Sequence, residues 1–391
     1  MFDRFLWYST KKGITMMRYL VLTLGLVCSL SGAVIRITDA WRDGQSLRAF
    51  HDQHRGTKDF IDMKQLDKKQ RDPLWNFFKT LGTQKKTPTL MLLELSRSER
   101  AKLAHMDKKT YEHKSFRKQL GYHFVKGKNR WGSVIVDTWD ERDIEQRQVS
   151  WALANTIDTL VQVYQKYYGC KAETQCLRWF DENASEEFFK DQSASSFHGS
   201  LRNTIVRALQ GKQLNQKEKS MGFWSVATVT IKEYLASLER FQAILSELEQ
   251  EQDIPRTIIQ KLTDDFRATV KRIQALIDDY HATIGRNLIK ATINDLILHY
   301  LMQPKSMQTF DKKVYGPFSL ISVILGDITM IKKVTEGLGR YDLVIVYAGD
   351  NHMRILIHYL NEKDFILNSK SVLKKSWQNP KEFQARLMKL P

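Results

Sequence analysis

The chain has 391 residues, of which 42% are hydrophobic, 11% are aromatic and 27% are charged, with only 7 prolines. This composition excludes a wholly disordered chain, because it supplies enough apolar surface to offset the entropy lost on folding. The formal net charge of +17 favours contact with anionic surfaces, such as phosphates and envelope polymers. The sequence shows no zinc-finger or RNP-type motif, so a nucleic acid partner is not expected.

The basic residues are spread over the chain in short clusters between acidic residues. The clusters are KSFRK at Lys114–Lys118, KGKNR at Lys126–Arg130 and KSVLKK at Lys370–Lys375. Such a diffuse pattern is typical of a solvated basic surface.

Residues 1–33 are typical of a signal peptide or an N-terminal anchor. Basic residues up to Arg18 precede an apolar run from Tyr19 to Ala33 that ends in small residues. The run is shorter than the roughly 20 residues that span a bilayer. Cleavage after this run predicts a mature chain that begins near Val34, with an uncleaved anchor as the alternative. We expect an exported protein, either periplasmic or secreted.

Export agrees with the cysteine pattern. Removal of the leader removes Cys28 and leaves Cys170 and Cys176. In an oxidising compartment we expect these two to form a disulfide. Two separate buried thiols are the alternative. Their spacing is that of neither a redox motif nor a zinc site.

Apolar runs in the first part of the chain predict β-strands at Val34–Thr38, Thr89–Ser96 and Ser133–Trp139. Near-continuous apolar runs are typical of strands in a sheet that is covered on both faces. The polar, histidine-containing stretch after the first strand can form a helix. Lys-rich amphipathic stretches between the later strands favour a βαβ arrangement.

From about residue 144 to residue 302 the pattern is helical. A stripe of apolar residues at steps of three, four or seven runs from Ile258 to Ile284, with charges at the other positions. Pro255 suits the start of that helix. We expect a helical insertion over residues 144–302.

The last part returns to α/β character. Tyr341–Tyr347 predicts a strand, Ala348–Asp350 a break, and Asn351–Leu360 a helix. We therefore expect an α/β fold with a mixed or mainly parallel sheet, built from residues 34–143 and 303–391. In such folds ligands bind at the carboxyl ends of the strands, where Asp350, Asn351 and His352 fall.

The segments VIVYAGDNHMRILIHYL (Val344–Leu360) and TINDLILHYLMQ (Thr292–Gln303) resemble the terminal motifs of the erythromycin esterase/TIKI/TraB-like superfamily. In that superfamily a last strand ends in a small-residue turn followed by His, and an Asp-bearing helix lies upstream. The resemblance is closest to a branch found in giant viruses and intracellular bacteria. LMLLELS (Leu90–Ser96) and SVIVDTWDERD (Ser133–Asp143) fit two further motifs. The resemblance implies a hydrolase.

The residue types suggest roles at such a site. His352 can transfer a proton or bind a divalent metal. Glu94 and Asp137 can activate a water molecule, and Glu94 can join His352 as a metal ligand. Asp295, one helical turn before His299, can orient an imidazole.

Arg142 can hold a carboxylate or phosphate of the substrate, and Asp350 and Asn351 are expected to contact it. Salt bridges, helix caps and core histidines are the structural alternatives for these residues.

The first motif of the superfamily departs from its pattern here. The resemblance places an acidic residue and a His near the end of the first strand, where this sequence reads Thr38 to Trp41. The His is replaced by Trp41, or its role has moved to His51 or His54. The latter two can share a helix face and bind a metal, with two surface histidines as the alternative.

The sequence therefore favours an exported hydrolase that acts on an ester or amide of an unidentified small molecule or peptide, with or without a divalent metal ion. A catalytically inactive ligand-binding protein and an envelope or host-interaction protein are the alternatives.

Overall fold

The computed structural model describes residues 33–53, 63–83, 88–107, 116–126, 130–142, 229–285, 291–301, 311–371 and 379–389, most of 195–216, and isolated positions between 146 and 193. Cys170, Cys176 and His54 lie outside the described residues, as does the predicted leader except Ala33. The predictions of a disulfide and a signal sequence therefore stay predictions.

The chain divides into two units by its internal contacts. The first, called the sheet unit here, comprises Val27–Arg142, Phe241–Asp265 and Val323–Pro391. The second, called the helical unit, comprises Met1–Leu26, Asp143–Arg240 and Phe266–Ser322. Each unit is described by itself.

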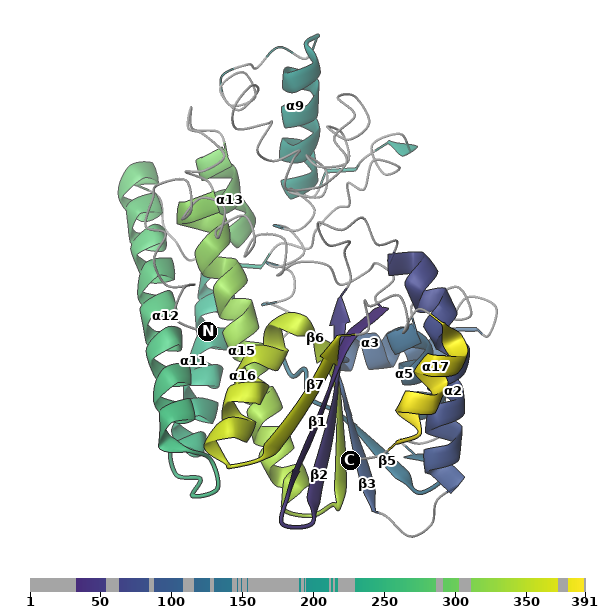
Figure 1. The fold of residues 1–391 in the computed structure, drawn as a ribbon. Helices are drawn as coiled ribbons and strands as arrows, with labels where there is room; N and C mark the ends of the chain where they lie inside the picture. Colours follow the sequence, from purple (N-terminus) through teal and green to yellow (C-terminus); the bar gives the residue numbers. More distant parts are fainter. Residues whose placement is uncertain are drawn as a thin grey trace, which may run out of the picture. The chain divides into compact units, whose positions relative to one another are not determined.

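The sheet unit contains a seven-stranded sheet in the order β4-β5-β3-β6-β2-β1-β7 (Figure 1). Its central strands β2, β6, β3 and β5 are parallel, while β1, β7 and β4 pair antiparallel with their neighbours. The fold is thus α/β with a mixed, mainly parallel sheet built from both ends of the chain, as the sequence predicts. The strands are β1 (Ala33–Arg42), β2 (Gln45–Gln53), β3 (Thr89–Leu93), β4 (Arg130–Trp131), β5 (Val134–Thr138), β6 (Leu343–Gly349) and β7 (Ile366–Ser371).

The stretch after the first strand begins with a strand, Gln45–Gln53, where a helix was predicted, while its later part, Met63–Thr83, is helical. β1 and β2 form an antiparallel hairpin in which Arg42 pairs with Gln45. Asp43 and Gly44 connect them with φ of 47° and 81°. Two residues with positive φ make the tight turn that matches the twist of a hairpin, and Asp-Gly is a strong signal for it.

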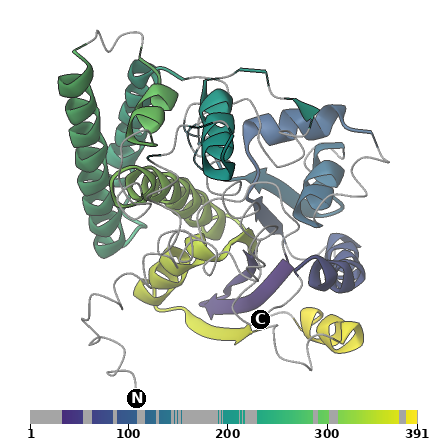
Figure 2. The same ribbon diagram turned by 90° about the horizontal axis from the view of Figure 1, so that it is seen from above.

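Helices cover both faces of the sheet (Figures 1 and 2). Phe50, Met91 and Tyr347 lie in the apolar core of one face, where helical side chains such as Phe78 and Phe116 pack against the strands. On the other face Gly337 lets a helix approach Leu90 and Val344 closely. The first face carries α2 (Met63–Thr83), α3 (Arg97–His105), α5 (Phe116–Lys126) and α17 (Pro380–Leu387), and the second carries α15 (Gly316–Leu338) and α16 (Asp350–Glu362).

The stretch Lys313–Leu338, most of which is α15, is long and apolar enough to cross a membrane by length and composition. Within its most apolar window, 83% is buried inside the protein, as in a core helix. No other described segment meets this criterion.

The described part of the helical unit confirms the helical character of the middle of the chain. Thr230 and Thr292 form an isolated antiparallel bridge. Each begins a helix with a reciprocal cap, to Glu233 and Asp295 respectively. Among the described residues the remaining helices, two of which extend into the sheet unit, are α9 (Phe197–Leu209), α11 (Ile231–Leu248), α12 (Arg256–Ile284), α13 (Ile293–Leu301) and the π-helix η3 (Asp311–Tyr315).

Helix α12 contains the predicted apolar stripe. Ile258, Leu262, Phe266, Ile273 and Ile277 are buried, whereas the positions between them are mostly charged and exposed. The stripe is therefore a packing face.

Candidate functional site

The carboxyl ends of β2, β6, β3 and β5 lie at one edge of the sheet, because these strands are parallel. Past the strand ends, the Glu94 amide donates to the Tyr347 carbonyl oxygen at 3.1 Å. The Trp139 amide donates to the Leu93 carbonyl oxygen at 3.2 Å. The Gly349 amide donates to Oε2 of Glu94 at 2.7 Å. Glu94 is thereby fixed beside the turn from β6 into α16, where α/β proteins place ligands.

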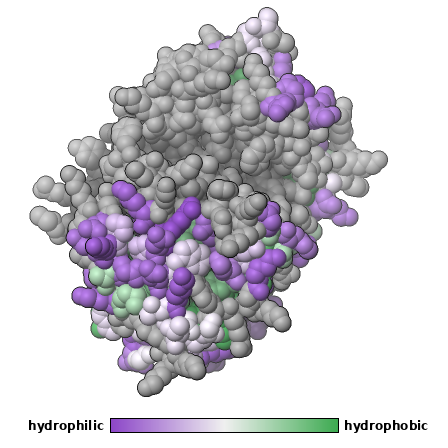
Figure 3. All heavy atoms as spheres, turned by 90° about the vertical axis from the view of Figure 1, so that its right-hand side faces the viewer, coloured by the Kyte–Doolittle hydropathy of each residue, from purple (hydrophilic) through white to green (hydrophobic). Residues whose placement is uncertain are grey.

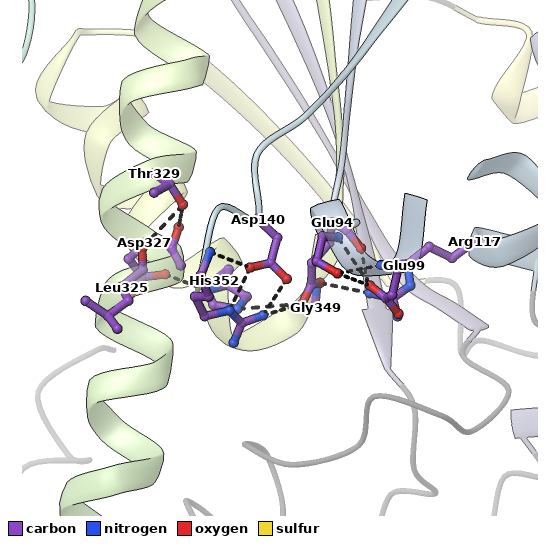
Figure 4. A network of polar contacts seen from close by, with 12 residues as sticks. Glu94, Glu99, Arg117, Asp140, Leu325, Asp327, Thr329, Gly349 and His352 are labelled. Carbon is purple, nitrogen blue, oxygen red and sulfur yellow. Dashed lines mark hydrogen bonds and ion pairs between the residues drawn. The ribbon is translucent and has the colours of Figure 1, made fainter. Parts of the chain in front are cut away.

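The imidazole of His352 lies between two carboxylates (Figure 4). Its Nδ1 is 2.7 Å from Oδ1 of Asp327 on α15. Its Nε2 is 3.8 Å from Oε1 of Glu94, which is too long for a direct hydrogen bond. The Trp139 ring packs edge-on against the imidazole with centroids 5.0 Å apart. One ring nitrogen is thus held, while the other faces a second carboxylate.

Gly326 permits this close approach of α15 to the imidazole. A Cβ atom at this position would lie 2.6 Å from Cε1 of His352, a distance that real Cβ contacts do not show. The His352 ring is buried and cannot move aside freely. The glycine one residue before Asp327 is therefore part of the architecture of the site.

Burial and hydrogen bonding act in opposite directions on the pKa of His352. Burial lowers it, but the hydrogen bond and charge of Asp327 and the charge of Glu94 raise it, and the pKa is above its usual 6.5. Burial raises the pKa of Asp327, against the effect of its hydrogen bond with His352. A proton on Nδ1 satisfies the bond to Asp327 in both the neutral and the charged imidazole. Nε2 is therefore the nitrogen that gains or loses a proton.

Arg142 is held by a carboxylate of its own segment. Its Nε and Nη2 donate to the two carboxylate oxygens of Asp140 at 2.7 and 2.8 Å. Its Nη2 also lies 3.8 Å from Oε1 of Glu94. Arg142 is thus at the site, but two of its three nitrogens already bind Asp140.

A second guanidinium approaches Glu94 from α5. Nη1 of the buried Arg117 donates to the Glu94 carbonyl oxygen at 2.9 Å and lies 3.7 Å from Oε2 of the same residue. Its Nη2 lies 4.0 Å from Glu99, which forms the capping box of α3 with Ser96. Arg117 therefore fixes both the main chain and the side chain of Glu94 (Figure 4).

Another histidine–carboxylate pair lies at the neighbouring strand ends. Nδ1 of His51 on β2 is 3.0 Å from Oδ1 of Asp350, the first residue of α16. Its Nε2 is 2.9 Å from Oγ1 of Thr38, which is also 3.0 Å from Oγ of Ser369. Burial lowers the pKa of His51 despite the raising effect of Asp350. The hydrogen bond with His51 lowers the pKa of Asp350.

The structure therefore brings together four of the residues that the sequence singles out. His352, Glu94 and Arg142 form one cluster, and Asp350 lies two residues before His352. Asn351 is half-buried between Asp350 and His352.

The other two predicted catalytic residues have different surroundings. The described contacts of Asp137 are with Lys333, at 3.0 Å, and with the Thr138 amide. Asp295 belongs to the helical unit, where its carboxylate accepts hydrogen bonds from the amide and the hydroxyl of Thr292. Asp295 therefore serves in the helix cap that Thr292 begins at the start of α13. The carboxylate that orients an imidazole is Asp327 instead.

The placement of the first motif at Thr38 to Trp41 is wrong. These residues lie on β1, which is antiparallel to β2, so β1 ends at the opposite edge of the sheet. The first strand with its carboxyl end at the site is β2, and it ends with His51, the buried Asp52 and Gln53. His51 lies on this strand, so it does not share a helix face with another histidine.

Sequence reasoning missed Asp327, Asp140, Arg117 and Gly326. A signal existed for Asp327, because it is a single carboxylate inside the apolar run ISVILGDITMI. Asp140 could also have been predicted, because it lies two residues before the cationic Arg142 in the sequence. No signal distinguished Arg117 in the sequence, because it is one of several basic residues on an amphipathic helix.

The residues of this cluster do not fit a divalent metal. The guanidinium groups of Arg117 and Arg142 lie within 4 Å of the Glu94 carboxylate and would compete with a cation there. Within the described ranges, no group of three or more His, Cys, Asp or Glu residues is placed to hold a metal ion. The chemistry considered below therefore uses side chains alone.

The fold and the site define an α/β protein with a buried Asp–His pair and a second carboxylate at the carboxyl ends of its parallel strands. Comparison of the chain with protein-family models, with curated proteins and with solved structures gives no match. The resemblance to the erythromycin esterase/TIKI/TraB-like superfamily therefore stays a prediction.

Proposed function

We propose that this chain is an exported hydrolase that cleaves an ester or amide with a water molecule activated by His352. The proposal depends above all on the position of the imidazole, with Nδ1 held by Asp327 and Nε2 facing Glu94 at the strand ends. A carboxylate that holds an imidazole in this way is the general-base unit of many hydrolases. The resemblance of the strand and helix sequences to the superfamily supports the same class.

The residues divide the reaction between them. Nε2 of neutral His352 takes a proton from water, whose oxygen attacks the carbonyl carbon and forms a tetrahedral intermediate. The intermediate breaks its bond to the leaving oxygen or nitrogen, which takes the proton back from Nε2. Glu94 accepts a hydrogen bond from the same water and orients it, since its Oε1 faces Nε2 at 3.8 Å, which is too far for a direct hydrogen bond.

Asp327 holds the imidazole in the productive tautomer and stabilises the imidazolium that forms. Arg142 and Arg117 lie within 4 Å of the Glu94 carboxylate and hold it in place. The proposal of export comes from the sequence of residues 1–33.

A panel of ester and peptide substrates tests the proposal. The purified protein should hydrolyse at least one of them, and His352→Gln should lower kcat/KM by about 10²–10⁴-fold, the usual contribution of a general base. Glu94→Gln should also lower it. His358→Gln is the matched control, because His358 lies on the same helix but is partly exposed and pairs with Glu362. Equal activity of the wild type and His352→Gln would reject the proposal.

A ligand-binding protein without catalysis is the second candidate. It is favoured by one observation: Glu94, Asp140 and Asp327 each already pair with a cationic group or an imidazole. Such a network can serve as the rigid wall of a binding site. Saturable binding of a panel compound without turnover would select this candidate.

A further inference from the structure

Two sequence features lie away from the candidate site. Trp41 lies near the end of β1, and Lys370 begins the basic segment KSVLKK. In the structure they line the same pocket, which has a volume of about 440 Å³. Asp43 and Gly44 of the turn between β1 and β2 line it, so it lies at the opposite edge of the sheet from the carboxyl ends of the parallel strands.

The register of the strands explains why these side chains converge. In the ladders Trp41 is opposite Ser46, and Asp39 is opposite Asn368. Opposite residues and alternate residues project from the same face of a sheet. Asp39, Trp41, Asn368 and Lys370 therefore project from one face, which α17 also covers.

Asp39, which lines this pocket, forms an ion pair with the buried Arg48. Arg48 is 1% exposed, and its Nε and Nη2 lie 2.6 and 3.1 Å from the two carboxylate oxygens of Asp39. The same guanidinium donates to the carbonyl oxygens of Leu387 and Lys389 at 2.6 and 2.5 Å. Arg48 thus fixes both Asp39 and the main chain that carries Lys389.

The lining has an excess of positive charge. Arg48 compensates Asp39, and Arg42 lies 3.5 Å from Asp43. The side chains of Lys370 and Lys389 are exposed and have no ion-pair or hydrogen-bond partner among the residues that the structure describes. Both ammonium groups are available to an anion.

We propose that this pocket binds a small anionic sugar, such as a sugar phosphate or a uronate. The indole of Trp41 offers an apolar face to a sugar ring. The volume of the pocket suits one small ligand. Asn368, Ser46 and Asp39 offer hydrogen-bond partners to hydroxyl groups. Lys370 and Lys389 pair with the anionic group.

Fluorine NMR of the full chain labelled with 5-fluorotryptophan tests this proposal. The chain has 9 tryptophans, and Trp41→Phe identifies the signal of Trp41. Glucose 6-phosphate and glucuronate should shift that signal with saturation at a Kd of about 1 mM or lower. Glucose should not shift it, because it has the ring without the charge.

Lys370→Gln and Lys389→Gln should each weaken the binding of glucose 6-phosphate about two- to fivefold, as expected for exposed ion pairs. Lys381→Gln is the control, because Lys381 is exposed on α17 but does not line the pocket. The absence of a saturable shift would overturn the proposal, as would an affinity equal to that of the wild type in a variant that combines Lys370→Gln and Lys389→Gln. Tighter binding of adenosine monophosphate than of glucose 6-phosphate would overturn the assignment to a sugar.

Discussion

Asp327 and His352 lie on different helices, and their hydrogen bond of 2.7 Å joins α15 to the first turn of α16. The bond connects a carboxylate inside an apolar helix to the ring at the carboxyl end of the sheet. Because the charge of Asp327 raises the pKa of His352, replacement of this charge should lower that pKa.

Asp327→Asn is the corresponding variant. We expect the pKa of His352 to fall in NMR titrations of the histidine nitrogens. Burial lowers this pKa, and the charge of Asp327 would no longer oppose that effect. Activity should fall as well, because an amide can hold the imidazole in the wrong tautomer. Asp137→Asn is the control, since Asp137 contacts Lys333 instead. An unchanged pKa of His352 in Asp327→Asn would contradict the assigned coupling.

His352 and His51 should affect the pH dependence of stability with opposite signs. The pKa of His352 is raised in the folded protein, so its contribution is complete below pH 6.5 and is lost as the pH rises through the folded pKa. The pKa of His51 is lowered, so its contribution is complete above pH 6.5 and is lost as the pH falls through the folded pKa.

Urea unfolding between about pH 5 and 8 checks both signs. Relative to the wild type, His352→Gln should lose more stability at the acidic end and His51→Gln more at the alkaline end. Parallel curves for the two variants would show that these pairs do not titrate as described.

Gly326→Ala should displace the imidazole. The added Cβ would lie 2.6 Å from Cε1 of His352, and overpacking of a core usually costs about 1–3 kcal/mol. We expect a lower free energy of unfolding together with a changed NMR signal of His352. Gly339→Ala is the matched control at the end of the same helix, where the nearest atom to a Cβ is 3.8 Å away. Equal stability of the two variants would argue against the tight contact.

Arg48→Met should destabilise the sheet unit strongly. It leaves the partly buried Asp39 carboxylate and the Leu387 carbonyl oxygen without the donor that the structure provides. Removal of one partner of a buried ion pair costs about 3–5 kcal/mol, which urea unfolding can measure. Arg354→Met is the control, because Arg354 is exposed on α16. A loss no larger than that of the control would show that Arg48 does not hold the end of the chain.

Much of the sheet could be predicted because its strands have local signals. Thr89–Leu93 and Leu343–Gly349 are almost wholly apolar and buried on both faces, so they cannot be mistaken for surface segments. Once both are placed as neighbouring parallel strands, Glu94 and His352 must meet at their carboxyl ends. This part of the site follows from topology alone.

β2 was harder to predict, because three of its buried residues are polar. Arg48, His51 and Asp52 read as surface positions in the sequence, but each is at most 2% exposed. Their partners, such as Asp39 and Asp350, come from other segments and carry no local signal. The hairpin could nevertheless have been predicted from Asp43-Gly44, because Asp-Gly is a common two-residue hairpin turn.

The hydropathy of the described surface is that of a solvated exterior. On the face seen in Figure 3 the described residues are mostly hydrophilic, with separate apolar groups between them.

The most direct test of the central claim is the pH dependence of kcat/KM on a hydrolysed panel substrate, measured beside the NMR titration of His352. A general base must be neutral to accept a proton, and the pKa of His352 is raised above 6.5. The rate should therefore rise with pH through a value above 6.5 that equals the pKa of His352 by NMR. A rate that is independent of pH in this range, or that follows a different pKa, would contradict the role of His352 as the base.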